Sequence, residues 1–196
     1  MPVIECDPDA ARDRLHEAGI STEPGNTDHE QWRVTHGDAT AVAYENKVVV
    51  QGRSPTDIMA HLTDGPRRAY LYFDGASRGN PGPSGIGWVI VANGGIVAEN
   101  GKTIGEATNN QAEYEALIAG LEAALAAGID ELVIQGDSEL IIKQVTGEYE
   151  TRNPELRERR VTVHELLHQF DDWELRHVPR SVNDRADDLA NEALDG

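Results

Sequence analysis

The sequence predicts an α/β protein with a mixed five-stranded sheet flanked by helices, preceded by a small α+β domain. From residue 69 onward, strand-like and helix-like stretches follow one another in the order βββαβααβα, which is typical of helices packed on the faces of a mixed sheet. The chain has 196 residues, of which 39% are hydrophobic, so it has room for one full domain and a small second one. We therefore predict domains at 1–68 and 69–196.

The first domain is predicted to contain a helix over 7–19, a hairpin over 40–52 and a second helix over 54–62. The second helix starts with Ser-Pro-Thr-Asp, which supplies a hydroxyl cap, a proline at the first position and an acid in the first turn. The Gly-Pro-Arg-Arg stretch at 65–68 is the expected joint between the domains.

Three strands open the second domain. Aromatic and branched residues predict them over 69–76, 85–93 and 95–104, with Asn-Gly-Gly at 93–95 as a turn. The first of these strands is expected to end at Asp74 and the glycine that follows it. The three strands should form an antiparallel meander.

A long helix is predicted over 110–127, because apolar residues recur there at helical spacing. This stripe consists of Tyr114, Leu117, Ile118, Leu121 and Leu125. Glu115 and Glu122 stand opposite the stripe and are expected to face solvent.

The rest of the chain completes the alternation. The predicted elements are a strand over 131–137, helices over 138–145 and 153–170, and a strand over 173–179. A capping box at Ser181–Asp184 is expected to open the final helix. The apolar stripe of that helix consists of Val182, Ala186, Leu189, Ala190 and Ala193.

The chain is strongly acidic along its whole length. It carries 35 Asp and Glu against 17 Lys and Arg, a formal net charge of −18. Such surfaces are associated with halophiles, since near-molar salt shortens the Debye length to about 3 Å and screens the repulsion. Charge alone argues against nucleic acid as a partner, because phosphate binding normally uses a basic footprint.

Cysteine count and hydropathy exclude two further classes of protein. The single cysteine, Cys6, excludes an internal disulfide and a multi-cysteine zinc site, and we interpret it as a small apolar residue. The longest apolar runs are far too short to span a bilayer, and the N-terminal stretch lacks the pattern of a secretory signal. The sequence therefore predicts a cytoplasmic protein without a membrane partner.

Four acidic residues stand where they can meet on the sheet. Asp74 closes an apolar strand before a glycine-rich turn, and Asp137 occupies the same place after its own strand. Glu113 lies in the first turn of its helix, and Asp187 lies at the margin of the last apolar stripe. Neighbouring carboxylates repel one another unless a cation lies between them.

The cluster favours divalent cations, because no matching lysines accompany the four acids. Ligation by oxygen alone suits Mg²⁺ or Mn²⁺. Two such ions about 4 Å apart can activate a water and stabilise the departing oxygen in a phosphoryl displacement. The spacing therefore indicates phosphodiester hydrolysis.

Four motifs occur in order between Ala69 and Leu194, namely FDGASRGNPGPSGIG, TNNQAEYEAL, GDSELI and NDRADDLANEAL. In these motifs the chain resembles type 1 ribonuclease H, whose members cut the RNA strand of an RNA–DNA hybrid. The acidic surface and the N-terminal extension resemble a halophilic archaeal member. The resemblance implies the ribonuclease H-like fold and a two-metal-ion mechanism with Mg²⁺ or Mn²⁺, in which Asp74 bridges the ions and Glu113, Asp137 and Asp187 complete their shells. A monomer without an organic cofactor is expected.

The resemblance also implies a histidine before the last helix that assists proton transfer or product release. His177 stands ten residues before Asp187, which is similar to the family spacing. A plain histidine at a strand end is the alternative, since an imidazole can serve either role. Arg180 is the competing candidate for the assisting role.

By the same resemblance, neutral residues around the acids contact the sugars, phosphates and minor groove of the hybrid. The matching positions are Gly75, Ser77, Asn80, Thr108, Asn109, Asn110, Ser138 and Asn183. Amides and hydroxyls suit hydrogen bonds to a ribose 2′-OH. Thr108 to Asn110 also precede a helix, so helix capping is a second role that can coexist with the first.

Two features depart from the family pattern. Better-known bacterial members carry a basic protruding helix that binds the hybrid, whereas residues 147–160 offer only a short connection of mixed charge. The acidic surface weakens long-range attraction to phosphate. Binding should therefore rest on shape, hydrogen bonds, metal bridges and stacking.

Other functions stay open at this point. The stretch His164-Glu-Leu-Leu-His168 matches the H-E-x-x-H pattern of zinc metalloproteases, but both histidines are expected to face solvent and no third ligand follows. An inactive module with a ribonuclease H fold that only binds nucleic acid is the better alternative, since fold does not prove function. Residues 1–68 are either a substrate-binding extension or a stabilising one.

Overall fold

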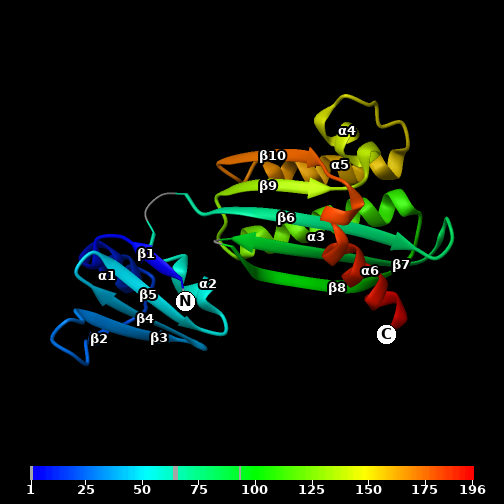
Figure 1. Cartoon of the computed structure of the whole chain (residues 1–196). Helices are drawn as coiled ribbons and strands as arrows, with labels where there is room; N and C mark the ends of the chain where they lie inside the picture. Colours follow the sequence, from blue (N-terminus) through cyan, green and yellow to red (C-terminus); the bar gives the residue numbers. More distant parts are fainter. Residues whose placement is uncertain (1, 64–65, 93) are drawn as a thin grey trace. The chain divides into compact units, whose positions relative to one another are not determined.

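The computed structural model describes residues 2–63, 66–92 and 94–196. The chain forms two units, Met1–Gly65 and Pro66–Gly196, each with its own hydrophobic core (Figure 1). The predicted boundary after residue 68 falls inside strand β6 (Arg68–Ser77). Within the described ranges, no helix is long and apolar enough to cross a membrane.

The N-terminal unit is an antiparallel five-stranded sheet with two helices. Its elements are β1 (Val3–Glu5), α1 (Pro8–Glu17), β2 (Glu23–Pro24), β3 (Trp32–His36), β4 (Ala39–Tyr44), β5 (Lys47–Gly52) and α2 (Pro55–Met59). The strand order is β1-β5-β4-β3-β2. The expected hairpin is β4 and β5. The other three strands were not predicted, since β1 and β2 have only three and two residues and show no periodicity.

Both helices of this unit lie on one face of its sheet. Their side chains share a core with the strands, formed by Ala11, Leu15, Trp32, Val34, Ala39, Ala41, Ala43, Val48, Val50, Ile58, Met59 and Leu62. The Trp32 indole donates a hydrogen bond of 2.9 Å to the Pro8 carbonyl, and Arg14 donates one of 2.8 Å to the Leu62 carbonyl. These bonds fasten α1 to the strands and to the end of α2. Cys6 packs against the same core, as its interpretation as an apolar residue expects.

The second unit contains the predicted order of elements. They are β6, β7 (Gly82–Ala92), β8 (Gly95–Ala107), α3 (Asn109–Ala126), β9 (Glu131–Gly136), α4 (Glu139–Thr146), α5 (Pro154–Leu167), β10 (Asp172–His177) and α6 (Asp184–Asp195). The sheet order is β10-β9-β6-β7-β8. The strands β10, β9 and β6 pair in parallel, and β7 pairs antiparallel with both β6 and β8. The predicted class is confirmed, and predicted boundaries differ from the observed ones by at most three residues. Asn93, in the expected turn, lies outside the described residues.

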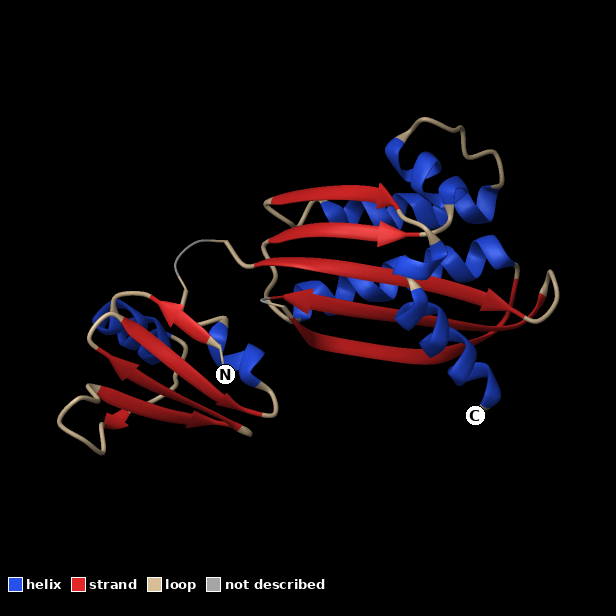
Figure 2. Ribbon diagram, in the orientation of Figure 1, coloured by secondary structure: helices blue, strands red, loops and turns tan. Residues whose placement is uncertain are grey.

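Helices cover the two faces of this second sheet unequally (Figure 2). The helices α3 and α5 bury one face, where Leu71 and Phe73 of β6 meet Leu117 and Leu121 of α3. The single helix α6 crosses the other face. Its backbone comes close because three glycines lie beneath it: a Cβ on Gly85, Gly87 or Gly101 would stand 2.4, 2.3 or 2.4 Å from carbonyl oxygens of α6. The glycines therefore set the height of α6 above the sheet.

The helix α3 is fastened at its start and along one side. Thr108 and Gln111 form a capping box. The backbone N–H of Gln111 donates to the Thr108 hydroxyl at 3.2 Å, and the backbone N–H of Thr108 donates to the side-chain oxygen of Gln111 at 2.9 Å. Glu115 was expected to face solvent, but it is half-buried and pairs with Arg159 of α5 at 2.8 Å. The prediction was wrong because α5 packs beside α3 on the side where Glu115 stands.

The start of α6 also differs from the prediction. Instead of a capping box at Ser181–Asp184, Arg180–Val182 form a short 3₁₀ turn, and Asn183 precedes the helix without a side-chain capping bond. The Asn183 amide is buried and donates to the Phe73 carbonyl at 2.8 Å. Val182 is exposed and so lies outside the buried stripe of this helix. The capping box does not form because Asn183 fastens the loop to β6.

Candidate active site

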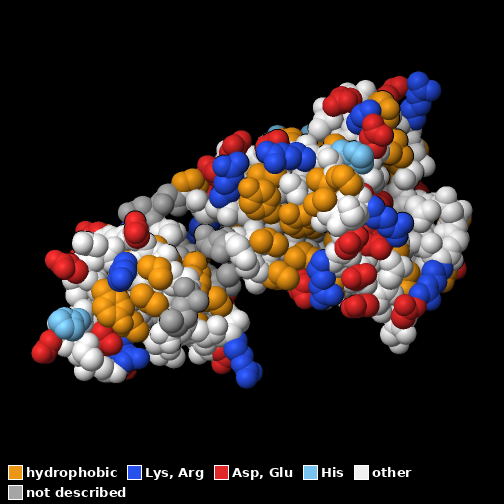
Figure 3. All heavy atoms as spheres, viewed as in Figure 1, with side chains coloured by type: hydrophobic (Ala, Val, Ile, Leu, Met, Phe, Trp, Pro, Cys, Tyr) orange, Lys and Arg blue, Asp and Glu red, His pale blue; other side chains and the backbone are white. Residues whose placement is uncertain are grey.

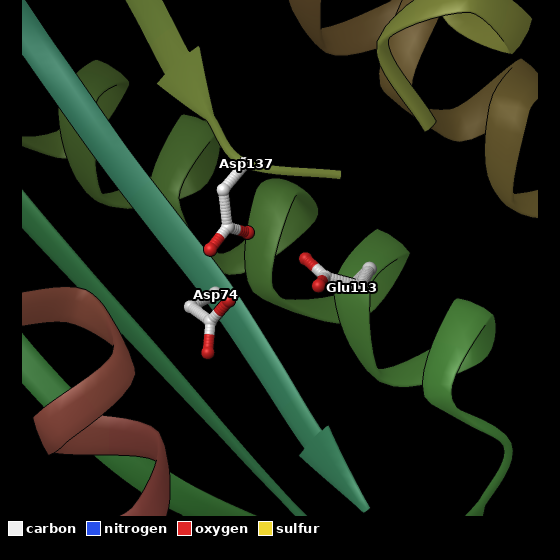
Figure 4. A group of neighbouring side chains, drawn as sticks. All are labelled: Asp74, Glu113 and Asp137. Atoms are coloured by element: carbon white, nitrogen blue, oxygen red, sulfur yellow. The ribbon is translucent and has the colours of Figure 1, made fainter. Parts of the chain in front are cut away.

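Three carboxylates from separate elements meet beside the centre of the sheet of the second unit (Figure 4). One oxygen each of Asp74, Glu113 and Asp137 lies within 4.8 Å of the others. The parallel ladder of β6 and β9 ends at the pair Tyr72 and Gln135. Asp74 and Asp137 each come two residues later, which brings them side by side. Asp74 does not end its strand as expected, because β6 continues to pair with β7 as far as Ser77.

Glu113 reaches this group because α3 lies unusually close to β6. A Cβ on Gly75 would stand 2.3 Å from the Ala112 carbonyl carbon and 2.4 Å from the Glu113 nitrogen. A side chain of any size at this position would push the helix away from the strand. The absence of a Cβ on Gly75 therefore places the first turn of α3, and Glu113 with it, beside Asp74.

Asp187 lies next to Asp74 but outside the group of three. It belongs to α6, one turn after Asn183, and its charge is among the causes that raise the pKa of Asp74. Arg180 donates to both Asp187 carboxylate oxygens, at 3.0 and 3.1 Å. The Asn191 amide donates to one of these oxygens at 3.1 Å. Asp187 is thus held at the edge of the cluster by two neighbours.

The cluster suppresses its own ionisation. Burial, followed by repulsion from Asp137 and Asp187, raises the pKa of Asp74 from 3.8 to about 8. Burial, followed by the charges of Asp74 and Asp137, raises the pKa of Glu113 well above its ordinary value, although the Gly75 amide opposes the rise. In both cases desolvation is the larger cause, and a nearby cation would reverse the effect.

The residues present fit a divalent cation. One Glu113 oxygen, Oε2, is buried and has no hydrogen-bond partner among the residues that the structure describes, which is costly for a carboxylate unless something else contacts it. All the donors are carboxylate oxygens, the set that Mg²⁺ and Mn²⁺ prefer. Asp74, Glu113 and Asp137 could hold an ion directly, and Asp187 could join them by releasing Arg180.

We expect the metal-free protein to lose stability as the pH rises from about 4 to about 8. Folded Asp74 keeps its proton up to about pH 8, whereas the unfolded chain releases it near 3.8. In this window the folded state binds the extra proton, so the free energy of unfolding falls with pH, by up to about 1.4 kcal/mol per pH unit for one proton. Chemical denaturation in EDTA at several pH values measures this slope. In Asp74→Asn the slope should be smaller, and equal slopes would contradict the assignment.

A cavity of about 610 Å³ opens over the cluster. It is lined by Asp74, Gly75, Ala76, Ser77, Asn109, Glu113, Asp137, Ser138, His177, Val178, Pro179, Arg180, Asp187 and Asn191. Four of the predicted substrate residues, Gly75, Ser77, Asn109 and Ser138, are therefore in this lining.

The other four predicted substrate residues lie outside the lining. Asn80 accepts a hydrogen bond from the Asn109 amide at 3.1 Å, and Thr108 caps α3. Asn110 lies in the first turn of α3 and is half-buried. Asn183 is only 1% exposed, so its side chain holds the strand that carries Asp74 and is not placed to touch a duplex.

His177 and Arg180 both face the cavity, from different positions. His177 is the last residue of β10, so it lies on a strand end and not on a loop, and its Nε2 is 3.1 Å from the Asp137 carbonyl oxygen. Arg180 follows in the 3₁₀ turn, and its guanidinium contacts Asp187. Asn191 was not predicted as a site residue, and its signal in the sequence is its position four residues after Asp187 on the same helix face.

The H-E-x-x-H pattern does not form a metal site in the described part of the chain. His164 was expected to face solvent, but it is half-buried, and its Nε2 is 2.9 Å from the Val145 carbonyl of α4. His168 is exposed at the end of α5. The ring of His164 joins α5 to α4 and is thereby occupied. The zinc protease alternative therefore has no support in the geometry.

Comparison with known proteins gives consistent matches. A family model described as reverse transcriptase-like matches residues 72–193. The chain is 59% identical over 197 residues to ribonuclease HI of Halobacterium salinarum, an alignment that covers 100% of this chain and 99% of that protein.

Solved structures match about two thirds of the chain. The crystal structure of RNase H1 from the halophilic archaeon Halobacterium salinarum NRC-1 is 63% identical with a TM-score of 0.65, covering 65% of this chain and 98% of that one. The structure of LC11-RNase H1 in complex with an RNA/DNA hybrid is 42% identical with a TM-score of 0.62, covering 65% of this chain and 96% of that one.

Proposed function

The chain belongs to the ribonuclease HI family, and we propose that it hydrolyses the RNA strand of RNA–DNA hybrids at the cluster of Asp74, Glu113, Asp137 and Asp187. The observation that carries this proposal is the meeting of carboxylates from β6, α3 and the end of β9 within 4.8 Å. The relative crystallised with an RNA/DNA hybrid shares 42% identity and supports the choice of substrate.

The proposed chemistry needs two Mg²⁺ or Mn²⁺ ions, which when bound would supply an activated water and positive charge for the leaving oxygen. Asp74 feels the charges of both Asp137 and Asp187, and it is the residue that would contact both ions. The close approach of Gly75 to the first turn of α3 places Glu113 beside Asp74. Arg180 and Asn191 orient Asp187.

Around the cluster, we assign substrate contact to the neutral groups of the cavity wall. Ser77, Asn109 and Ser138 present hydroxyls and an amide beside the acids. Such groups can bond the 2′-OH that distinguishes RNA from DNA without adding charge. Asn80, which holds the Asn109 backbone, and Thr108, which caps α3, would act by placing this wall.

For proton transfer we propose His177, with Arg180 as the alternative. A histidine side chain can pass on a proton, whereas a guanidinium stays charged. His177→Ala should lower kcat about a hundredfold and change the pH dependence of kcat. Arg180→Met should keep this pH dependence and change the divalent-ion concentration needed for half-maximal rate, because Asp187 loses one of its two partners and keeps Asn191. The opposite pattern would assign the assisting role to Arg180, in product release.

A digestion series tests the function itself. Labelled hybrid, duplex DNA and duplex RNA of one sequence would be incubated with Mg²⁺ or Mn²⁺ across a salt titration up to molar concentration. We expect cleavage of the RNA strand of the hybrid only. Binding of the hybrid without cleavage under every condition would favour the alternative of an inactive nucleic-acid-binding module.

The remaining assignments rest on the sequence. We propose that residues 1–68 are an extension that either binds substrate or adds stability, that the chain acts as a monomer without an organic cofactor, and that it works in a salt-rich cytoplasm. The net charge of −18 supports the last point. Deleting residues 1–68 and measuring hybrid affinity and Tm would separate the two roles of the extension.

A further inference from the structure

Two serine hydroxyls converge on the same two backbone carbonyls at one end of the second sheet. Ser77 is the last residue of β6 and lies opposite Ser84 of β7 in the strand register. Ser77 Oγ lies 2.9 Å from the Ala107 oxygen and 3.5 Å from the Gly82 oxygen, and it also reaches the Gly79 oxygen. Ser84 Oγ lies 3.1 and 2.8 Å from the oxygens of Ala107 and Gly82. Because a carbonyl oxygen only accepts, both hydroxyls donate; we call these two side chains the serine pair.

The serine pair joins the ends of three strands. Gly82 begins β7 and Ala107 ends β8, and these two residues lie opposite one another in the ladder of the two strands. Ser84 is only 1% exposed, so water does not compete for its hydrogen bond. Ser77 lines the cavity. The serine pair therefore fastens β6, β7 and β8 to one another beside the cavity.

A tight turn over residues 78–81 leaves from the serine pair and carries Asn80. The backbone N–H of Arg78 donates to the Pro83 carbonyl at 2.8 Å, which closes the turn. Gly82 lets the chain fold back so closely, since a Cβ at this position would stand 2.3 Å from the Arg78 oxygen. The position of Asn80 therefore depends on how the two ends of this turn are fastened.

The start of α3 leaves from the same point. Ala107 is followed directly by Thr108, which caps α3. The backbone N–H of Asn109 then donates to Asn80 Oδ1 at 3.1 Å, which joins the helix start to the turn. Asn109 lines the cavity, and Glu113 lies one turn further along the same helix. Two residues assigned to the substrate and one acid of the cluster therefore share one anchor.

Placement of neutral groups matters at this site because the surface beside the cavity is rich in acids. Acidic side chains gather over α6 in Figure 3, and the exposed acids of this helix are Asp184, Asp188, Glu192 and Asp195. Negative side chains repel the phosphates of a nucleic acid unless salt screens them. Binding at the cavity wall then depends on neutral hydrogen bonds, which weaken steeply when donor and acceptor are misaligned.

We propose that Ser77 and Ser84 are positioning residues for substrate binding, which hold Asn80 and the start of α3 at the spacing that the RNA strand requires. The inference rests on the proposed function for its choice of substrate. Groups that are already in place bind without first losing conformational freedom, so loss of the serine pair should weaken binding more than it slows the chemical step. Ser77 donates its only proton to the protein, so toward the substrate its hydroxyl can only accept.

The test is steady-state cleavage of a labelled hybrid by full-length variants at saturating divalent ion. Ser77→Ala and Ser84→Ala should each raise KM about fivefold and change kcat less than about twofold, which is the size expected for one neutral hydrogen bond. Ser21→Ala is the matched control, because Ser21 is an exposed serine outside the cavity lining, and it should leave KM unchanged. If Ser84→Ala does not fold, the half-buried Ser77 carries the test alone.

A double-mutant cycle separates positioning from direct contact with the substrate. If Ser77 acts by holding Asn80, Ser77→Ala should add little to the KM of Asn80→Ala. A KM increase in the double variant equal to the product of the two single increases would overturn the proposal. Wild-type KM values in Ser77→Ala and Ser84→Ala would also overturn it, even if the Tm falls. Failure of the wild type to cleave any hybrid would instead overturn the proposed function.

Discussion

Asp74→Asn is expected to lower the rate of hybrid cleavage roughly a thousandfold while the fold persists. Asp74 is 5% exposed, and the charges of both Asp137 and Asp187 act on it, so we expect its carboxylate to be the main donor of the cluster. An amide has nearly the same shape but carries no charge, and it attracts a divalent ion far less than a carboxylate does. Steady-state cleavage of a labelled hybrid measures the loss.

The same substitution should stabilise the metal-free protein near pH 8, because it removes a buried charge that its neighbours repel. Asp188→Asn is the matched control, since Asp188 is exposed on the same helix as Asp187. It should change neither the cleavage rate nor the stability by much. Full activity of Asp74→Asn would remove Asp74 from the catalytic assignment.

Gly75→Ala is expected to lower activity about a hundredfold and stability by about 2–3 kcal/mol. The added Cβ would stand 2.3 and 2.4 Å from backbone atoms of Ala112 and Glu113, and backbone cannot give way as a flexible side chain can. The first turn of α3 must then move away from β6 and carry Glu113 with it. Urea denaturation and the rate of hybrid cleavage measure the two effects.

Gly196→Ala is the control for Gly75→Ala. A Cβ added to Gly196 would lie 3.6 Å from the Glu192 carbonyl oxygen, an ordinary van der Waals distance. It should behave as wild type. A variant Gly75→Ala with unchanged stability but reduced activity would point to a direct substrate contact at Gly75. Unchanged values of both would contradict the close packing of α3 on β6.

The order of elements in the second unit was predictable because its helices and strands are long and periodic. The helix α3 has 18 residues and the strand β7 has 11, so each contains enough apolar residues to be recognised from the sequence. The strands β1 and β2 are too short to show a pattern, and the sheet pairs them through partners far along the chain. Their existence depends on tertiary contacts that a local pattern does not contain.

The acids of the site were predictable in kind and less so in arrangement. Position at element ends singled out Asp74, Glu113, Asp137 and Asp187, and four ordered motifs gave the family, whose membership is shown by 59% identity over the whole chain. That Asp74 lies within its strand follows from continued pairing with β7, which only the register shows. The pairing of Asp187 with Arg180 joins a turn to a helix and leaves no local signal.

The role of Asn183 illustrates a second limit. Its type suits a helix cap, a substrate contact or a structural bond, and the sequence favours none of these. The fold gives Asn183 the structural role, because its side-chain amide donates a hydrogen bond to the Phe73 carbonyl, 110 positions away in the chain. Asn183 thereby joins the start of α6 to the strand that carries Asp74.

The most direct measurement is a crystal structure of the protein with a hybrid and Mn²⁺, recorded at a wavelength where manganese scatters anomalously. The account predicts two anomalous peaks about 4 Å apart, both contacted by Asp74, with Glu113, Asp137 and Asp187 completing the ligands beside a phosphate of the RNA strand. Peaks elsewhere, or a hybrid seated away from these carboxylates, would contradict it.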